Sequence, residues 1–190
     1  MCINEHLTMI RVALLAVAIV ALVVVLPNAL PAEVHDHADF AVYLHGNLYD
    51  FSKEQYMRED REPRIHFHDL NGRIVHVHAR GVTLGMLFAG MNMTLTDRCL
   101  NLDNGTAYCT DERHRLTLSV NGRINNAFAD YVIVDDDSIL IVYGDESDET
   151  IRGYAAAMPD DACIYSETCP ERGSPPPEEG CVGNECALEE

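Results

Sequence analysis

Basic residues are scarce in this chain, and lysine is the scarcest of them. The 190 residues include 31 acidic side chains against 13 basic ones, which gives a formal net charge of -18, and Lys53 is the one lysine. This excess of negative charge repels phosphate backbones and anionic membrane surfaces. We therefore expect no nucleic-acid partner. Many acids with almost no lysine is also a composition typical of proteins from salt-loving organisms, which we keep as a hypothesis.

Several motifs that mark common enzyme classes are missing. The sequence has no Gly-rich phosphate-binding loop and no Gly-x-Ser-x-Gly nucleophile elbow. It also lacks the Cys-x2-Cys pairs of a zinc ribbon. Asp69 and Glu62 are candidates for a general base, but no motif marks either one. The sequence alone therefore leaves open whether the protein is an enzyme.

One long apolar run lies near the N-terminus, at residues 10–26, with Arg11 as its single charge. Its length is at the short limit for a membrane-spanning helix and slightly long for the core of a signal peptide. The small residues at 29–32 favour cleavage, whereas the weakly basic start favours a retained anchor. Because Arg11 flanks the N-terminal side, both alternatives place the remainder outside the cytoplasm. We predict that residues 1–32 are a membrane anchor or a signal segment. The protein is then a single-pass membrane protein if the segment is retained and a secreted protein if it is cleaved.

Six of the seven cysteines follow the apolar run, at Cys99, Cys109, Cys163, Cys169, Cys181 and Cys186. An even number in an oxidising compartment predicts three disulfides. Cys99 and Cys109 flank a turn-rich insertion that contains Asn104-Gly105, so we expect them to close that loop. The other four have Cys-x5-Cys and Cys-x4-Cys spacings, which favour disulfides over thiolate metal ligation. Their pairing stays open.

The region after the apolar run predicts a small α+β domain with a mixed sheet and one packed helix. We expect strands at 38–44, 48–51, 64–68, 73–78, 116–120 and 138–144, with turns at Gly46-Asn47 and Asn121-Gly122. A helix capped by Thr83 is predicted from the apolar spacing of Leu84, Leu87, Phe88 and Met91. The predicted domains are 1–32, the histidine-rich domain 33–153, and an acidic, Pro- and Cys-rich tail 154–190. This tail cannot form a core of its own, so disulfides must order it.

The order strand, turn, strand, helix, strand, turn, strand, together with VNGRI and VDDDSILIVYG, resembles the β-grasp architecture of small ubiquitin-like sulfur carriers. The resemblance covers about Arg64 to Gly144. It implies a shared fold but not a shared activity, because the Gly-Gly terminus that carries sulfur in that family is missing and Asp145 follows Gly144.

Histidine supplies the main chemical signal. Six of nine histidines form three His-x-His doublets: His35 and His37, His66 and His68, His76 and His78. In a strand, residues two apart point to the same face, so each doublet presents two imidazoles side by side. Threonine, lysine and glutamate are commoner choices where a sheet face needs only to be polar. His45 and His114 stand alone in the sequence, outside the doublets, and we expect each to be exposed to solvent.

The turn between the second and third doublets determines whether they share a face. Asp69-Leu70-Asn71-Gly72 predicts a type I turn with a glycine bulge, which pairs His66 with His76. The four histidines of this hairpin then lie on one face and the apolar residues Ile65, Phe67, Val75 and Val77 on the other. A two-residue loop at Asn71-Gly72 would mix the two faces, and burial of one face opposes that register.

The first strand follows the same pattern. Ala38, Phe40, Val42 and Leu44 form its apolar side, and His35, His37, Asp39, Tyr43 and His45 form the other. If this strand neighbours the hairpin, all three doublets converge, with Asp39 and Asp69 as oxygen ligands or orienting partners. The predicted metal site comprises His66, His68, His76, His78, His35, His37, Asp39 and Asp69.

Imidazole and carboxylate ligands suit a divalent transition metal, and we expect zinc or copper. An open ligand position on the same ion would allow a metallohydrolase or oxidase. A metal-free, disulfide-stapled interaction module is the third alternative.

Overall fold

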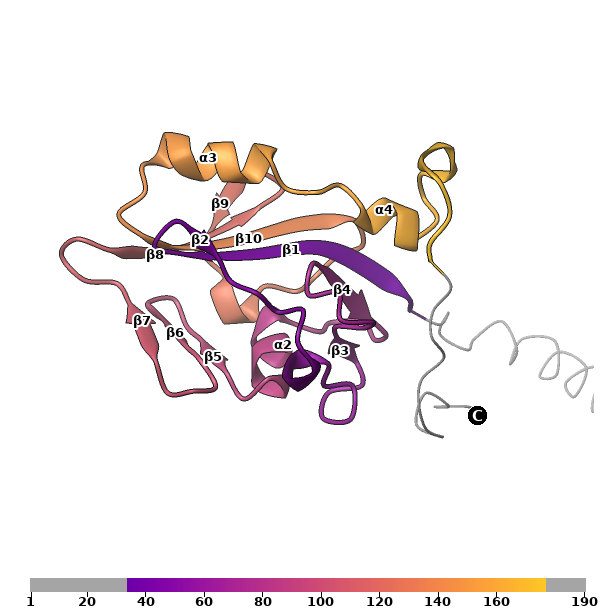
Figure 1. The fold of residues 1–190 in the computed structure, drawn as a ribbon, viewed down its shortest axis with the longest axis horizontal. Coiled ribbons are helices and arrows are strands. Elements are labelled where there is room, and N and C mark those ends of the chain that lie inside the picture. The colour runs from indigo at the N-terminus through magenta and orange to yellow at the C-terminus, as the bar shows by residue number, and fades with distance from the viewer. Residues whose placement is uncertain (1–33, 177–190) are drawn as a thin grey trace, which may run out of the picture. The chain divides into compact units, whose positions relative to one another are not determined.

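A seven-stranded mixed sheet forms the centre of the protein, as the computed structural model shows for residues 34–176 (Figure 1). Its strand order is β3-β4-β1-β10-β8-β9, and β2 pairs with the far end of β1. No helix within residues 34–176 is long and apolar enough to cross a membrane. The apolar run at 10–26 lies outside the described residues, as do Cys181 and Cys186. The α+β class is confirmed.

The two central strands, β1 (Asp36–Leu44) and β10 (Asp137–Gly144), run parallel, with Ala38 opposite Asp137. Both are rich in β-branched and apolar residues because both faces of the sheet are covered, which is the usual situation of parallel strands. Alternate residues of β10 pack into separate cores: Ile139 and Ile141 on one side, Leu140 and Val142 on the other.

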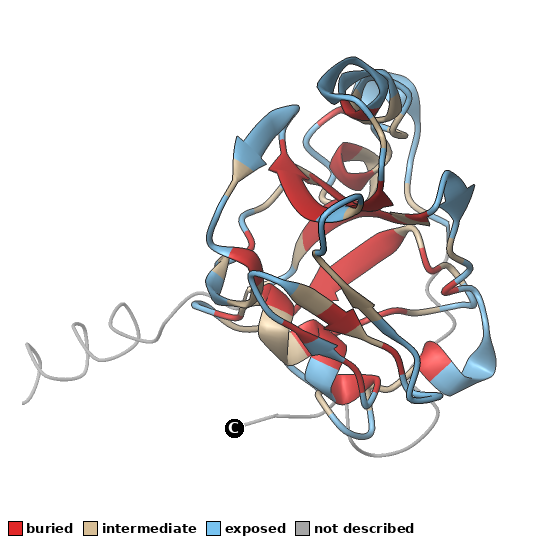
Figure 2. Ribbon diagram, turned by 90° about the vertical axis from the view of Figure 1, so that its left-hand side faces the viewer, coloured by how far each residue is buried: buried red, intermediate tan, exposed pale blue. Residues whose placement is uncertain are grey.

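The larger core lies between the sheet and α2 (Leu84–Gly90). Leu84, Leu87, Phe88 and Met91 are all buried there, which confirms the predicted apolar face. Thr83 stands at the N-cap, but its side chain makes no capping hydrogen bond, and its backbone instead bridges to Val132. The buried residues form a continuous interior between helix and strands (Figure 2).

The β3–β4 hairpin has the predicted register but a different turn. β3 (Ile65–His66) pairs with β4 (Ile74–Val77) so that His66 faces His76, as predicted. Asp69 and Leu70 both have positive φ, and the amide of Asn71 donates to the carbonyl of His68 over 2.7 Å, which is a type I′ geometry. The predicted type I turn with a bulge at Gly72 is therefore wrong.

Close packing explains the glycine at position 72. A Cβ there would lie 2.4 Å from the backbone carbonyl carbon of Phe51. Phe51 was predicted to end a return strand, but β2 is only Asn47–Leu48, and the Phe51 side chain is buried against Phe40 and Phe67. The turn before β2 is at His45-Gly46, one residue earlier than predicted. Gly72 thus permits a close approach of two chain segments.

The remaining strands follow the sequence closely. β8 (Arg115–Val120) and β9 (Arg123–Asn125) meet at the predicted Asn121-Gly122 turn, where both residues have positive φ. A small sheet of β5 (Thr94–Leu95), β6 (Cys99–Asn101) and β7 (Ala107–Cys109) carries the predicted Cys99–Cys109 disulfide between directly opposed residues. Short 3-10 helices η2 (Glu54–Tyr56) and η3 (Phe128–Asp130) contribute Tyr56 and Phe128 to the core.

The chain after Gly144 forms helices that the sequence did not predict. These are α3 (Asp148–Ala156), α4 (Ala162–Tyr165) and the 3-10 helix η4 (Pro170–Arg172). α3 covers the second face of the sheet through Ile151, on the side opposite α2 (Figure 1). α4 packs against β1 and is closed by a second disulfide, Cys163–Cys169. Its position matters because the histidines lie on the same face.

Candidate metal centre

The sheet order brings the three histidine doublets together. β4 lies between β1 and β3, and one row of paired residues crosses all three strands: His37 faces His76, which faces His66. His35 directly precedes β1 and His78 directly follows β4, and their ring centroids are 4.9 Å apart. The condition for convergence, that the first strand neighbours the hairpin, is met, so the three doublets lie on one face, and the apolar residues of the hairpin lie in the core on the other face.

Two groups of three histidines have ligand atoms close enough to hold a metal ion. They are His35, His76 and His78, and His66, His68 and His78, with every ligand atom in a group within 4.8 Å of the others. Neighbouring rings link the groups, since the centroids of His68 and His76 are 4.5 Å apart. The cluster runs from the exposed His35 to the buried His66 and His76.

The tautomer of His66 follows from its surroundings. Its Nδ1 lies 3.1 Å from the carbonyl oxygen of Glu62, which can only accept, so Nδ1 carries the hydrogen. Burial, and then the neighbouring His68, lower the pKa of His66 to about 3. The ring is therefore neutral near pH 7, and Nε2 has an unprotonated lone pair. That lone pair faces Nε2 of His68 at 2.8 Å.

The carboxylate of Glu59 lies on the other side of His68. Nδ1 of His68 lies 3.5 Å from Oε2 of Glu59. Because Nε2 of His66 has no hydrogen, Nε2 of His68 must donate one across the 2.8 Å contact when no metal is present. A cation placed between the two nitrogens would replace this proton.

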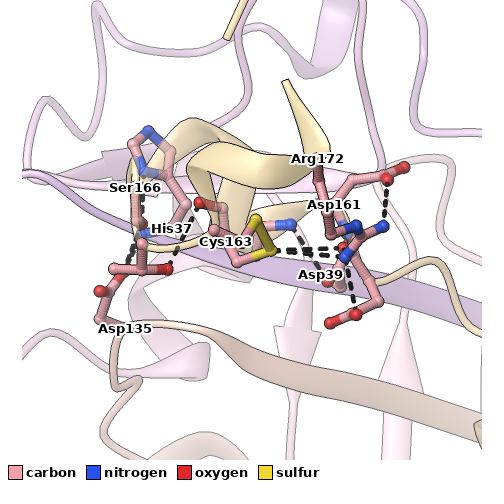
Figure 3. The surroundings of a disulfide bond; sticks show 11 residues. His37, Asp39, Asp135, Asp161, Cys163, Ser166 and Arg172 are labelled. Carbon is pink, nitrogen blue, oxygen red and sulfur yellow. Dashed lines mark hydrogen bonds and ion pairs between the residues drawn. A yellow bond between two sulfur atoms is a disulfide. The ribbon is translucent and has the colours of Figure 1, made fainter. Parts of the chain in front are cut away.

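His37 is held by a chain of hydrogen bonds from α4 and the loop before β10 (Figure 3). Ser166 Oγ donates to the carboxylate of Asp135 and accepts from Nδ1 of His37 at 3.0 Å. Burial, and then His35, lower the pKa of His37 to about 4. Its Nε2 is left with a lone pair that is buried and has no hydrogen-bond partner within residues 34–176.

The pKa of buried His76 is lowered further than the pKa values of His37 and His66. Burial, followed by His68 and His37, lowers its pKa to about 2. Its Nδ1 is also buried with no hydrogen-bond partner in the described part of the chain. An unsatisfied buried polar atom costs about 1–3 kcal/mol, so two such atoms in one histidine cluster require a reason. Tyr165 of α4 covers both rings, with centroids 5.6 Å from His37 and 5.9 Å from His76.

The two predicted oxygen ligands lie apart from these groups. Asp39 is buried, and its carboxylate accepts hydrogen bonds from the backbone amides of Asp161 and Ala162, at 3.1 and 3.2 Å. Burial raises its pKa to about 6, although the two amide hydrogen bonds oppose that shift. Asp69 is exposed in the hairpin turn and belongs to neither histidine group. Asp39 therefore attaches α4 to β1.

His45 is exposed, as predicted, whereas His114 is half-buried. Their ring centroids are 5.0 Å apart, and both rings lie against Tyr143. Nδ1 of His114 also lies 3.2 Å from the carboxylate of Asp111. The pair belongs to neither histidine group described above.

A third set of possible ligand atoms comprises Asp136, Asp160 and Cys163. Cys163 is bonded to Cys169, so it has no thiolate to offer, and both carboxylates are exposed. This set is a weaker candidate than either histidine group.

Comparison with known protein-family models, curated proteins and solved structures gives no match. The function of the chain must therefore be argued from the geometry of its residues.

Four residues that support the histidines were missed at the level of sequence: Glu59, Asp135, Tyr165 and Ser166. Glu59 and Asp135 stand among many acids in a strongly acidic chain, so composition does not distinguish them. Tyr165 lies 94 residues beyond Asn71, and Ser166 lies 129 residues beyond His37, within a tail with no periodic pattern. The one local signal was the Cys163 and Cys169 spacing, which indicated order in that segment.

Proposed function

We propose that this chain is an extracytoplasmic domain, membrane-anchored or secreted, that binds a divalent transition metal, zinc or copper, through its His-x-His pairs. The observation that carries the proposal is the opposed pair of Nε2 atoms of His66 and His68. Once a cation replaces the proton that His68 donates in this contact, both nitrogens offer it a lone pair, and tetrahedral ligation with bonds of about 2.0–2.1 Å places two nitrogens about 3.3 Å apart. The 2.8 Å contact needs to open by only about half an ångström.

The other histidines supply the ligands that complete the coordination. Nε2 of His37 and Nδ1 of His76 are buried nitrogens with no hydrogen-bond partner in residues 34–176, and a bound cation would satisfy them. The carbonyl of Glu62 and the carboxylates of Glu59 and Asp135 act as outer partners that fix ring orientation. Such outer partners accompany almost every ligating histidine.

Zinc and copper suit this ligand set better than softer or harder ions. Imidazole nitrogen favours Zn²⁺ and Cu²⁺, whereas Cu⁺ favours thiolate and thioether. The four described cysteines are all in disulfides and offer no thiolate. The general order of affinity among divalent metals favours copper, and availability often favours zinc, so both ions should be tested.

Two features support an extracytoplasmic location. The paired disulfides are of a kind that persists in oxidising compartments. The apolar run at 10–26 has the composition of an export segment.

For the fold, a β-grasp relationship is supported by the parallel pairing of β1 with β10 beside α2, and this pairing extends the resemblance back to residue 36.

A metallohydrolase or oxidase on the same ion is the second candidate. Each group contains three histidines, and three protein ligands with an open fourth position is the arrangement of catalytic zinc. Adding azide to the copper-loaded protein tests for the open position. A new charge-transfer absorption band is expected if the position is open, and an unchanged spectrum would contradict the catalytic candidate.

Metal analysis of the refolded full chain tests the proposal. After loading with zinc or copper and removal of excess ion, we expect at least one ion per chain. His66→Ala combined with His76→Ala should lose most of it, and His114→Ala should retain it, because His114 lies outside the cluster. A folded wild-type chain with no stoichiometric metal would sink the proposal and favour a metal-free interaction module.

A further inference from the structure

The cluster contains more imidazoles than one ion can use. Six histidines converge, whereas zinc takes four ligands in structural sites and three in catalytic sites. We infer that the cluster holds two divalent ions, one on each side of His78, whose two ring nitrogens bind one ion each. This inference depends on the proposed metal-binding function and extends it to stoichiometry.

The position of β4 accounts for the shared ligand. β4 is the middle strand of β3-β4-β1, so a residue on its histidine face has a histidine neighbour on each side. The ring of His78 lies 4.9 Å from that of His35 on the β1 side. It lies 5.1 Å from that of His66 on the β3 side, in a stacked orientation.

The two metal-capable groups have only His78 in common. The β1-side group adds His35 and His76, and the β3-side group adds His66 and His68. His37 lies beside the β1-side group without belonging to it: its ring is 4.7 Å from that of His76, and its buried Nε2 has no hydrogen-bond partner among the described residues. Each side therefore has three nitrogens when His78 serves both.

Each side also has its own carboxylate. Glu59 approaches His68 on the β3 side, at 3.5 Å. Asp135 reaches His37 on the β1 side through the hydroxyl of Ser166. The cluster thus has one carboxylate near each of its two sides, and each carboxylate can offset part of the positive charge of one ion.

Binding of a second ion to the imidazole of His78 releases the proton of its ring. The first ion binds one ring nitrogen of neutral His78, and the second ion displaces the proton from the other nitrogen into solvent. The ring then carries one negative charge between two dications. With metal–nitrogen bonds of about 2.0–2.1 Å and the width of the ring, the ions lie about 6 Å apart.

The inference is tested by counting ions per chain in the full protein loaded with copper(II). We expect two ions in the wild type. His35→Ala should retain the β3-side ion, and His68→Ala should retain the β1-side ion, so each variant should hold one. His35 is exposed, so its replacement should leave folding intact. If His68→Ala does not fold, His68→Gln serves the same purpose, and His45→Ala is the matched control, expected to hold two.

Electron paramagnetic resonance adds a readout of the bridge itself. Two copper(II) ions joined through one imidazole ring couple antiferromagnetically, so the integrated signal of the wild type should fall well below two spins per two coppers. His35→Ala should restore one spin for its one copper. His78→Ala should abolish the coupling whatever number of ions it holds.

The outcomes separate the two proposals. No bound ion in the folded wild type overturns the proposed function and this inference with it. One ion per chain leaves the proposed function standing and overturns the two-ion inference. Two uncoupled ions, or two ions retained by His35→Ala, also overturn it, because the second ion would then lie elsewhere.

Discussion

Three buried histidines with strongly lowered pKa values set the chemistry of this site at the scale of single residues. His37, His66 and His76 have pKa values of about 4, 3 and 2, and burial is the largest cause for each. Protons compete with metal ions for imidazole, so a histidine that is already neutral binds metal without first losing a proton. Burial thus prepares these rings for a cation.

The same lowered pKa values predict how the stability of the metal-free protein depends on pH. In the unfolded chain these histidines bind protons near pH 6.5, whereas in the folded chain they stay neutral to pH 4 or below. The unfolded state therefore binds more protons below pH 6.5, and folding stability must fall as pH falls. Asp39 opposes this between roughly pH 4 and pH 6, because its pKa is raised to about 6.

The three histidines outweigh Asp39, so we expect the free energy of unfolding to drop by about 2–3 kcal/mol between pH 6 and pH 5. Denaturant unfolding in the presence of a chelator measures it, at high salt to screen the net charge. His76→Asn should make the dependence shallower, because it removes one of the three groups. A flat or opposite pH dependence in the wild type would contradict the burial of neutral histidines.

Replacing Glu59 tests the effect of an outer carboxylate beside His68 without removing a proposed metal ligand. It lies 3.5 Å from Nδ1 of His68 and is partly exposed, so Glu59→Gln should leave the fold unchanged. Loss of an outer carboxylate typically lowers metal affinity 10–100-fold. Competition titration with a chromophoric chelator measures the loss. Glu54→Gln, on the exposed surface of η2, is the control, and equal affinities of the two variants would rule out a role for Glu59.

At the scale of elements, α4 covers the histidine face. Three contacts hold it: Asp39 accepts its first amides, Tyr165 Oη accepts from Asn71 over 3.1 Å, and Ser166 binds His37. A four-residue helix has little stability of its own. The Cys163–Cys169 disulfide closes this segment (Figure 3). It thereby helps to keep Tyr165 over the rings of His37 and His76.

Removing this disulfide should loosen the cover. For a loop of this length, Cys163→Ser with Cys169→Ser should lower the free energy of unfolding by about 2 kcal/mol. Metal should also dissociate faster, because Tyr165 no longer stays over His37 and His76. Stopped-flow transfer of metal to a chelator measures the rate.

The second disulfide provides the matched control. Cys99 and Cys109 join β6 to β7, away from the histidine strands. Cys99→Ser with Cys109→Ser should lower stability while leaving the dissociation rate near that of the wild type. If both pairs of substitutions change the rate equally, α4 has no specific covering role.

At the scale of the whole molecule, negative charge dominates. The chain has a net charge of -18, and its negative side chains repel one another in the compact state. Salt screens that repulsion, with a Debye length of about 10 Å at 0.1 M. We expect the unfolding midpoint to rise between low and molar potassium chloride. Thermal unfolding at fixed pH measures it, and a midpoint that falls in molar salt would contradict the high-salt hypothesis.

The sequence by itself determined the local features: the apolar face of α2, the Asn121-Gly122 turn, the Cys99–Cys109 bridge and the sidedness of the histidine strands. Each of these depends on residues near one another in the chain, and burial of one face specifies a register strongly. The hairpin register was correct even though its turn was not, because the apolar side of the hairpin selects the register and several turn geometries can connect it.

Only the tertiary structure decided which elements meet. The pairing of β1 with β4 and β10 joins segments separated by up to about a hundred residues, and no local pattern encodes that distance. The same holds for α4: the contacts of Tyr165 and Ser166 with the histidines, and the use of Asp39 to attach a helix, arise from packing alone. Sequence could name the candidate ligands, but their convergence, their tautomers and the single histidine shared by both groups are properties of the folded sheet.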